Sequence, residues 1–171
     1  MAEVRYMKEA DLEQVLRWRN HPDIRSKMYT QHEISWEEHA RWFERTKSDE
    51  NVHLLIYEDP EPLGFISFKS SVNQAEAVWG FYVAPDAPAG TGVRMGHSAL
   101  DFAFSELGYE VIKGEVISFN RRSSGYHEKL GFTRHGKLVG KYQENEKSYD
   151  IEQFCLTAQQ WNKIRGMYHG E

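Results

Sequence analysis

Hydrophobic residues in the first fifty positions recur at helical spacing. Apolar side chains repeat in this way from Leu12 to Trp18, and Asp11 stands where it can cap that helix. The helix is expected to end at Arg19-Asn20-His21-Pro22, because the residue before a proline avoids the helical region, and a short helical piece follows to about Met28. Ser35-Trp36-Glu37-Glu38 is a capping box, which predicts the start of another helix.

Further along the chain the hydrophobic pattern changes to that of β-strands. Strands are predicted at positions 4–7, 52–57, 63–71, 75–83, 111–117, 132–139 and 149–156, with a turn at Asn73-Gln74. Helices are expected at positions 94–107 and 122–130, the second ending at Gly131, and Thr157 with Gln160 opens a last helix. This order of strands and helices predicts a mixed α/β fold.

Composition and charge narrow the class of protein. A chain of 171 residues fits one domain, here 1–171, that buries about 70% of its unfolded surface. The formal net charge of -5 argues against a protein that binds nucleic acid through a basic surface. With no apolar signal segment and no membrane-spanning stretch, we expect a cytoplasmic protein without a membrane partner. The single Cys155 excludes an internal disulfide, and the histidine spacing predicts no metal site.

The stretch from Trp79 to Leu107 is the first candidate for a ligand site. An apolar strand gives way to the loop 84–93, which contains two glycines and leads into an amphipathic helix. Small residues let backbone amides approach a ligand closely, and a helix N-terminus favours an anionic group such as a phosphate. Taken alone, however, this pattern is more typical of an ordinary connection between a strand and a helix.

A second segment changes that interpretation. Residues 120–132 read Asn-Arg-Arg-Ser-Ser-Gly-Tyr-His-Glu-Lys-Leu-Gly-Phe. They resemble the Asn…Tyr-Glu-Lys-Leu-Gly-Phe segment of the GCN5-related N-acetyltransferases (GNAT), and the order of elements is similar over nearly the whole chain. The resemblance implies a GNAT fold, in which a mixed, mostly antiparallel sheet is splayed at its fourth and fifth strands and has helices on both faces. It also implies acetyl-CoA as the cofactor, with CoA as product.

The front of the chain resembles one branch of this family more closely. Val15–Pro22, Met28-Tyr29 and the helix containing Trp36 look like the branch that acetylates a nucleotide-linked amino sugar in pseudaminic acid biosynthesis. That likeness implies acetyl transfer to the 4-amino group of a UDP-linked 4-amino-4,6-dideoxy sugar, by direct attack of the amine on the thioester. Acetylation of peptide or ribosomal-protein N-termini, and an acyl-CoA-binding module without activity, remain the alternatives. The sequence leaves open whether the protein forms a homodimer.

The same resemblance assigns the residues that hold acetyl-CoA. They are Phe81, Tyr82 and Val83 of the strand, Gly90, Thr91, Gly92, Val93, Arg94, Met95 and Gly96 of the loop and helix start, and Asn120. Arg94 stands where the family usually has a glycine, so a guanidinium is expected near a phosphate. Asn120 is nearly as typical of a turn or a helix cap.

Three residues are candidates for the catalytic chemistry. The tyrosine that gives a proton to the leaving thiolate in the family aligns with His127, and Tyr126 precedes it. Adjacent helical residues point about 100° apart, so only one of the two is expected to face the sulfur. Ser67 is a candidate donor to the amine or to a water. The sequence does not decide the general base, for which water, Glu76 and His39 are the alternatives.

The acceptor side carries a further set of candidates. These substrate-binding residues are Arg19, Asn20, Tyr29, His39 and Trp79. Arg19 is expected to pair with a phosphate, and an aromatic ring such as Tyr29 or Trp79 to stack on a ring of the substrate. Each of them is at least as typical of a cap, a turn or the core.

Overall fold

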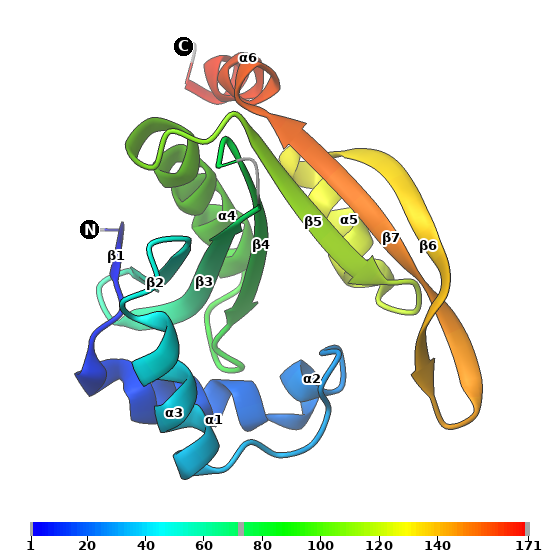
Figure 1. Ribbon diagram of the computed structural model, residues 1–171. Coiled ribbons are helices and arrows are strands. Elements are labelled where there is room, and N and C mark those ends of the chain that lie inside the picture. The colour runs from blue at the N-terminus through cyan, green and yellow to red at the C-terminus, as the bar shows by residue number, and fades with distance from the viewer. Residues whose placement is uncertain (1, 72–73, 170–171) are drawn as a thin grey trace. The chain divides into compact units, whose positions relative to one another are not determined.

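The computed structural model describes residues 2–71 and 74–169 (Figure 1). Its contacts group into two compact units. The N-terminal unit comprises Met1–Lys69 and Gly80–Ala99, and the C-terminal unit comprises Ser70–Trp79 and Leu100–Glu171. Strand β4 (Glu76–Val83) and helix α4 (Thr91–Asp101) each contribute residues to both units.

The strands of the described residues form one mixed sheet of seven, in the order β1-β2-β3-β4-β5-β7-β6. Besides β4 they are β1 (Glu3–Tyr6), β2 (Val52–Glu58), β3 (Pro62–Ser70), β5 (Val111–Ile117), β6 (Thr133–Glu144) and β7 (Lys147–Thr157). The pairs β1–β2, β2–β3, β5–β7 and β6–β7 are antiparallel. In contrast, β4 and β5 pair in parallel, from Glu76 opposite Val111 to Val78 opposite Lys113. The predicted mixed, mostly antiparallel sheet is confirmed.

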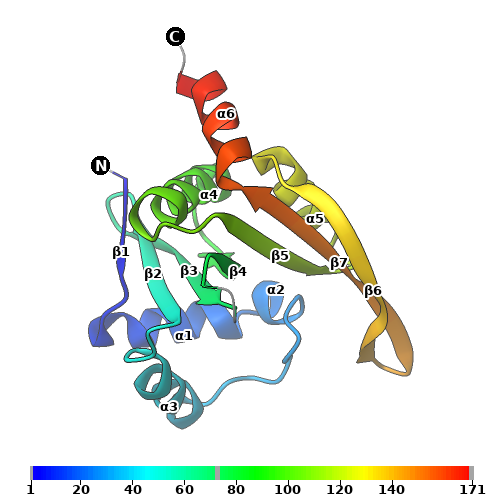
Figure 2. The ribbon, with the colours of Figure 1, turned by 45° about the horizontal axis from the view of Figure 1, so that its top comes forward.

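The N-terminal unit buries an apolar core between helices and strands. Helices α1 (Leu12–Asn20) and α3 (Trp36–Thr46) contact one another, and the short α2 (Pro22–Arg25) follows α1 (Figure 2). The core includes Leu12, Val15, Trp18, Phe43, Leu54, Ile56, Phe65 and Tyr82. Alternate residues of a strand share a face, so Leu54 and Ile56 reach this core together.

The C-terminal unit is built on the hairpin of β6 and β7. Helix α5 (Arg121–Leu130) packs on β5 and β6, and α6 (Ala158–His169) follows β7 (Figure 1). The hairpin turns at Asn145 and Glu146, which both have positive φ, as a tight two-residue turn requires. Both strands are longer than predicted. The prediction ended too early because the residues near the turn are mostly polar and show no apolar alternation.

Local capping signals predicted several boundaries correctly. The Ser35 hydroxyl accepts from the Glu38 amide at 3.1 Å. Thr157 and Gln160 form the complete capping box, with bonds of 2.9 and 3.1 Å between the amide of each residue and the side chain of the other. Gly131 ends α5 with φ at +104°. These three predictions are confirmed.

Other local predictions differ from the structure. The prediction that Asp11 caps α1 is wrong, since its carboxylate accepts from the Lys8 amide at 2.7 Å and so caps the preceding 3₁₀ turn, Glu9–Asp11. Helix α4 begins at Thr91, three residues before the predicted start, and continues as a π-helical turn over Phe102–Glu106. The predicted turn residue Asn73 lies outside the described residues.

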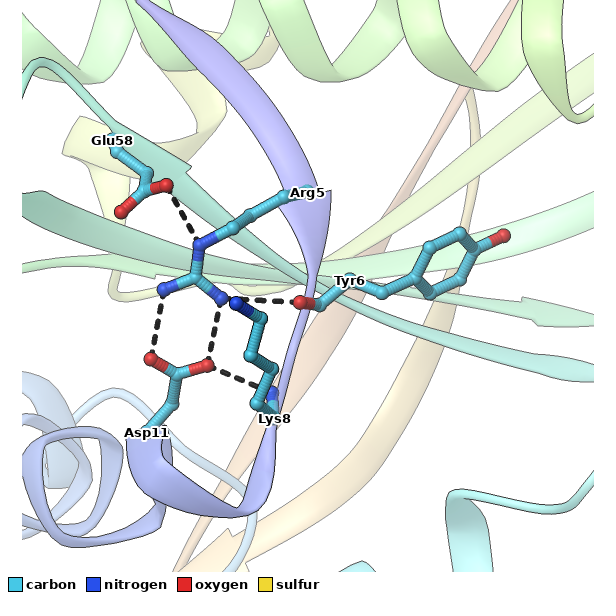
Figure 3. A network of polar contacts seen from close by, with 5 residues as sticks. All are labelled: Arg5, Tyr6, Lys8, Asp11 and Glu58. Carbon is cyan, nitrogen blue, oxygen red and sulfur yellow. Dashed lines mark hydrogen bonds and ion pairs between the residues drawn. The ribbon is translucent and has the colours of Figure 1, made fainter.

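Arg5 joins three elements of the N-terminal unit (Figure 3). Its Nη1 and Nη2 each donate to an oxygen of Asp11 at 2.8 Å, and its Nε donates to Glu58 at 2.7 Å. The Arg5 and Asp11 side chains are 21% and 10% exposed, so water screens this pair weakly. Burial raises the pKa of Asp11, but the hydrogen bonds from Arg5 and the Lys8 amide outweigh burial and hold that pKa below its ordinary value.

Replacing Asp11 by Asn is expected to lower the free energy of unfolding by about 1.5–3 kcal/mol at neutral pH, because a charged hydrogen-bond acceptor is lost. The folded-state pKa lies below the unfolded value of about 3.9, so this stabilisation is present above that value and is lost as the pH falls through the folded-state pKa. Urea unfolding of both proteins should therefore show a difference that shrinks on acidification. The exposed Asp86, changed to Asn, is the control. A deficit of constant size at acid pH would mean that the carboxylate charge is not its source.

Candidate functional site

The start of α4 gathers amides and a cation in the N-terminal unit. Gly90 has φ at +85°, a conformation that side chains strongly disfavour. The Thr91 hydroxyl donates to the Pro88 carbonyl at 2.6 Å, and the Arg94 amide donates to the Gly90 carbonyl at 3.2 Å as the helix begins. Arg94 is exposed and bends back toward the N-terminus, where its Nη2 donates to the Thr91 hydroxyl at 3.3 Å. A guanidinium therefore lies at the helix end that already favours anions.

Several residues of the predicted loop and strand face the core instead. Met95 is fully buried, and its sulfur fills the space where a side chain at Gly64 would lie. Tyr82 packs on Phe65 with ring centroids 4.9 Å apart, and burial raises the pKa of its phenol. Gly92, Val93, Phe81 and Val83, by contrast, are half-buried.

His127 is held at both ring nitrogens within the C-terminal unit. Its Nδ1 lies 2.8 Å from the Ser123 carbonyl, and its Nε2 lies 3.0 Å from Nε1 of Trp79. A carbonyl only accepts and an indole nitrogen only donates, so the ring is neutral with its proton on Nδ1. The side chain is 2% exposed and burial lowers its pKa below the ordinary value, which favours this neutral form.

Trp79 and Tyr126 lie against each other beside this histidine. The Trp79 ring stacks on Tyr126 at 6.3 Å and on Phe132 at 5.4 Å, with interplanar angles of 9° and 20°. Trp79 is 5% exposed, which leaves little surface for the predicted stacking on a substrate ring. Tyr126 is half-buried, and burial raises the pKa of its phenol well above its ordinary value.

Asn120 lies at the start of α5, and Ser67 lies on β3 beside Gly80 of β4. The Asn120 Oδ1 accepts from the Ser123 amide at 3.3 Å and caps α5, which confirms the alternative interpretation of this residue as a cap. Within the part of the chain that the structure describes, its Nδ2 has no hydrogen-bond partner, so that nitrogen stays available to a ligand. Ser67 is half-buried on β3, with its hydroxyl 3.1 Å from the position that a Cβ at Gly80 would take.

Arg19 is the predicted acceptor residue with unmet hydrogen-bonding capacity. Its Nη2 donates to the Thr30 carbonyl at 2.6 Å, while its buried Nη1 has no partner among the described residues. Burial lowers the pKa of Arg19, the nearby Tyr82 and Glu38 raise it, and Arg25 lowers it. The result is a partly desolvated guanidinium whose Nη1 meets no anionic partner in residues 2–71 and 74–169.

Other predicted acceptor residues make contacts within the N-terminal unit. Asn20 donates to the Ile34 carbonyl at 2.8 Å and accepts from the Ile34 amide at 2.7 Å. His39 is 4% exposed and bonds the Leu12 carbonyl at 2.8 Å, and burial lowers its pKa. Tyr29 is 52% exposed on the segment after α2. Glu76, a candidate base of the C-terminal unit, pairs with Lys113 at 3.0 Å.

A polar groove of about 710 Å³, which the sequence did not predict, runs beside α5 in the C-terminal unit. Its acidic and basic side chains largely pair with one another. Glu152 accepts from Ser124 at 2.5 Å and from Arg134 at 2.8 Å, and Arg134 also reaches Glu128 at 3.2 Å. Its lining does not include Tyr126 or His127.

In residues 2–71 and 74–169, no group of three or more His, Cys, Asp or Glu side chains is placed to hold a metal ion. None of the helices found there combines the length and the apolar character needed to cross a membrane.

Comparison with known proteins defines the class. Residues 3–133 match the family model described as an acetyltransferase (GNAT) domain, and the chain therefore belongs to the GNAT acetyltransferases. It is an acetyl-CoA-dependent N-acetyltransferase, as the motif at 120–132 predicted.

Individual relatives agree with this assignment. Acetyltransferase PseH of Campylobacter jejuni is 28% identical over 147 residues, covering 85% of this chain and 85% of that protein. The SPbeta prophage-derived uncharacterized N-acetyltransferase YokL of Bacillus subtilis is 32% identical over 126 residues, covering 72% and 71%. The crystal structure of a spermidine N-acetyltransferase from Vibrio cholerae with CoA and spermine has a TM-score of 0.85 at 20% identity, covering 94% of this chain and 98% of that one. The last likeness shows the fold alone.

The two bonds between Asn20 and Ile34 predict a local effect of mutation. Asn20→Ala is expected to lower the free energy of unfolding by about 1–3 kcal/mol, because the partly buried backbone groups of Ile34 lose their partners. Hydrogen exchange should accelerate at Ile34 and its neighbours, while acetyl-CoA binding stays unchanged. Exposed Asn51, changed to Ala, is the control. Unchanged exchange at Ile34 would refute this anchoring role.

Proposed function

We propose that this acetyltransferase transfers the acetyl group of acetyl-CoA to the 4-amino group of a UDP-linked 4-amino-4,6-dideoxy sugar. The resemblance of Val15–Pro22 and Met28-Tyr29 to the pseudaminic acid branch supports this acceptor. Two relatives named Acetyltransferase PseH, at 28% and 29% identity, agree with that branch. The observation that carries the proposal is the buried Nη1 of Arg19, for which the described part of the chain offers no hydrogen-bond partner.

Arg19 favours an anionic acceptor over a polyamine. Arginine binds phosphate oxygens through paired N–H groups, and a partly desolvated guanidinium gains most from such a partner. Its Nη1 is buried and has no hydrogen-bond partner among the described residues, while Glu38 and Arg25 lie nearby with opposite charges. Spermine is a polycation and offers the Arg19 guanidinium no acceptor, whereas the diphosphate of a UDP sugar supplies the missing acceptor. The binding energy of the nucleotide then positions the amine for reaction.

The start of α4 fits the pyrophosphate of acetyl-CoA. The first backbone amides of α4 lie at the positive end of the helix dipole, and the Arg94 guanidinium bends toward that end. Acetyl-CoA supplies the acetyl group as a reactive thioester. Asn120 is assigned to the pantetheine arm through its Nδ2, and a backbone N–H from Phe81 to Val83 is assigned to the thioester carbonyl. A donor of this kind contributes about 3 kcal/mol in acyl transfer.

Tyr126 is the better candidate for the acid that protonates the thiolate. The one proton of the neutral His127 ring is already donated to the Ser123 carbonyl, and its other nitrogen accepts from Trp79. The Tyr126 phenol keeps its proton through neutral pH because burial raises its pKa. The geometry thus supports the residue one place before the position that aligns with the family's tyrosine. Ser67 remains a prediction as donor to the amine or a water.

Tyr126→Phe tests this assignment. A positioned acid typically contributes about 10²- to 10⁴-fold, so kcat is expected to fall in that range while acetyl-CoA still binds. The pKa of Tyr126 is raised, so wild-type kcat should show no loss of acid below about pH 10. If cationic His127 were the acid, kcat would instead decline above about pH 6.5 or lower, since burial depresses the pKa of that ring. That decline, together with an active Tyr126→Phe, would return the role to His127.

Arg19→Ala tests the acceptor. With the UDP-linked 4-amino sugar, KM is expected to rise about 10- to 100-fold, the loss of one charge-assisted contact, while acetyl-CoA binding stays normal. Arg17→Ala, on the same helix but exposed, is the matched control. A mass-spectrometric assay should compare the UDP sugar with the same sugar lacking UDP, with peptides carrying a free N-terminus, and with spermidine. Faster acetylation of a peptide or spermidine than of any UDP-linked amino sugar would refute the proposed acceptor.

A further inference from the structure

Trp79 and His127 form a buried pair, and neither side chain takes part in a chemical step of the proposed reaction. We propose that this pair positions the Tyr126 phenol, so that Trp79 and His127 are positioning residues for the acid. The inference rests on the proposed function of Tyr126. It concerns side chains of the C-terminal unit alone.

The hydrogen bond fixes both rings. Trp79 donates from Nε1 to His127 Nε2 at 3.0 Å, and the two side chains are only 5% and 2% exposed. The opposite nitrogen of His127 donates to the Ser123 carbonyl at 2.8 Å, one turn earlier on α5. The imidazole is thus anchored to the helix backbone. An indole has a single donor, so rotation of Trp79 would leave a buried N–H without its acceptor.

The fixed indole in turn sets the plane of the tyrosine. Trp79 and Tyr126 lie nearly parallel, at 9°, with centroids 6.3 Å apart, while the rings of Tyr126 and His127 are close to perpendicular at 89°. Phe132 also stacks on Trp79, and its ring centroid lies 5.0 Å from that of His127 in a T-shaped arrangement. The phenol therefore lies against a surface whose orientation depends on the hydrogen bond. Displacements of about 1 Å reduce turnover as much as 10²-fold in oriented sites.

Gly114 on β5 provides the space that the pair needs. A Cβ at this position would lie 2.5 Å from His127 Nε2 and 3.1 Å from Trp79 Nε1. A methyl group would therefore push against both atoms of the hydrogen bond. The requirement is spatial, and it gives a substitution that disturbs the pair without removing either ring.

The first test observes the hydrogen bond without relying on activity. In protein labelled with ¹⁵N-tryptophan, the Trp79 indole signal is assigned by its loss in Trp79→Phe. The indole proton is expected to exchange slowly with water in the wild type and faster in Gly114→Ala. Fast exchange in the folded wild type would overturn the proposal.

The second test separates positioning from folding. Trp79→Phe and Gly114→Ala are expected to lower kcat about 10- to 100-fold, with the KM for acetyl-CoA unchanged. Gly125→Ala is the matched control on α5, since a Cβ there meets nothing within 4 Å. His127→Gln, which restores an acceptor, should retain more activity than His127→Leu. Normal kcat in both Trp79→Phe and Gly114→Ala would overturn the proposal, as would an equal loss of acetyl-CoA binding in both.

The failure of this inference is distinguishable from failure of the proposed acid. If Tyr126→Phe is fully active, Tyr126 is not the acid and there is nothing for the pair to position, even when the indole proton is protected. If Tyr126→Phe is inactive but Trp79→Phe turns over normally, the acid stands and the positioning role is overturned.

Discussion

The packing of the C-terminal unit depends on a single imidazole, whose two nitrogens both form hydrogen bonds within the unit. His127 ties α5 to its own backbone through Ser123 and to β4 through Trp79. Its ring also stacks on Phe154 of β7 with centroids 5.0 Å apart, and Gly114 of β5 leaves room for it. One side chain therefore touches four elements. A buried polar group in this position is tolerated because each of its hydrogen-bonding sites is satisfied.

Much of the fold was predictable because its boundary signals are local. A capping box or a glycine with positive φ acts within a few residues, so Ser35, Gly131 and Thr157 could be interpreted from the sequence. The full length of the β6–β7 hairpin was not predictable, because the residues next to its turn are mostly polar and form no apolar alternation in the sequence. The prediction that Asp11 caps α1 failed for another reason. Its sequence position suits a cap of α1, but Arg5 lies close enough to bind both carboxylate oxygens.

The sequence allowed us to predict which segments carry the candidate site. It did not allow us to predict which residue takes which role. The motif at 120–132 located α5 and its glycine, and the family assignment agrees with it. That motif places His127 at the position of an acid, yet the partner that occupies its Nε2 is Trp79, 48 residues earlier. No local pattern contains such a pairing. The same holds for Arg19, whose unpartnered Nη1 is visible only once burial is known.

The surroundings of α5 also support the proposal that the acid is a phenol and not an imidazolium. Burial disfavours the charged form of any group, so one environment lowers the pKa of His127 and raises that of Tyr126. An acid that must be cationic to donate loses its proton in such a place, whereas an acid that is neutral when protonated keeps it. The Tyr126 phenol therefore keeps its proton through neutral pH. His127, neutral and hydrogen-bonded at both nitrogens, is better suited to act as a fixed acceptor for the Trp79 indole.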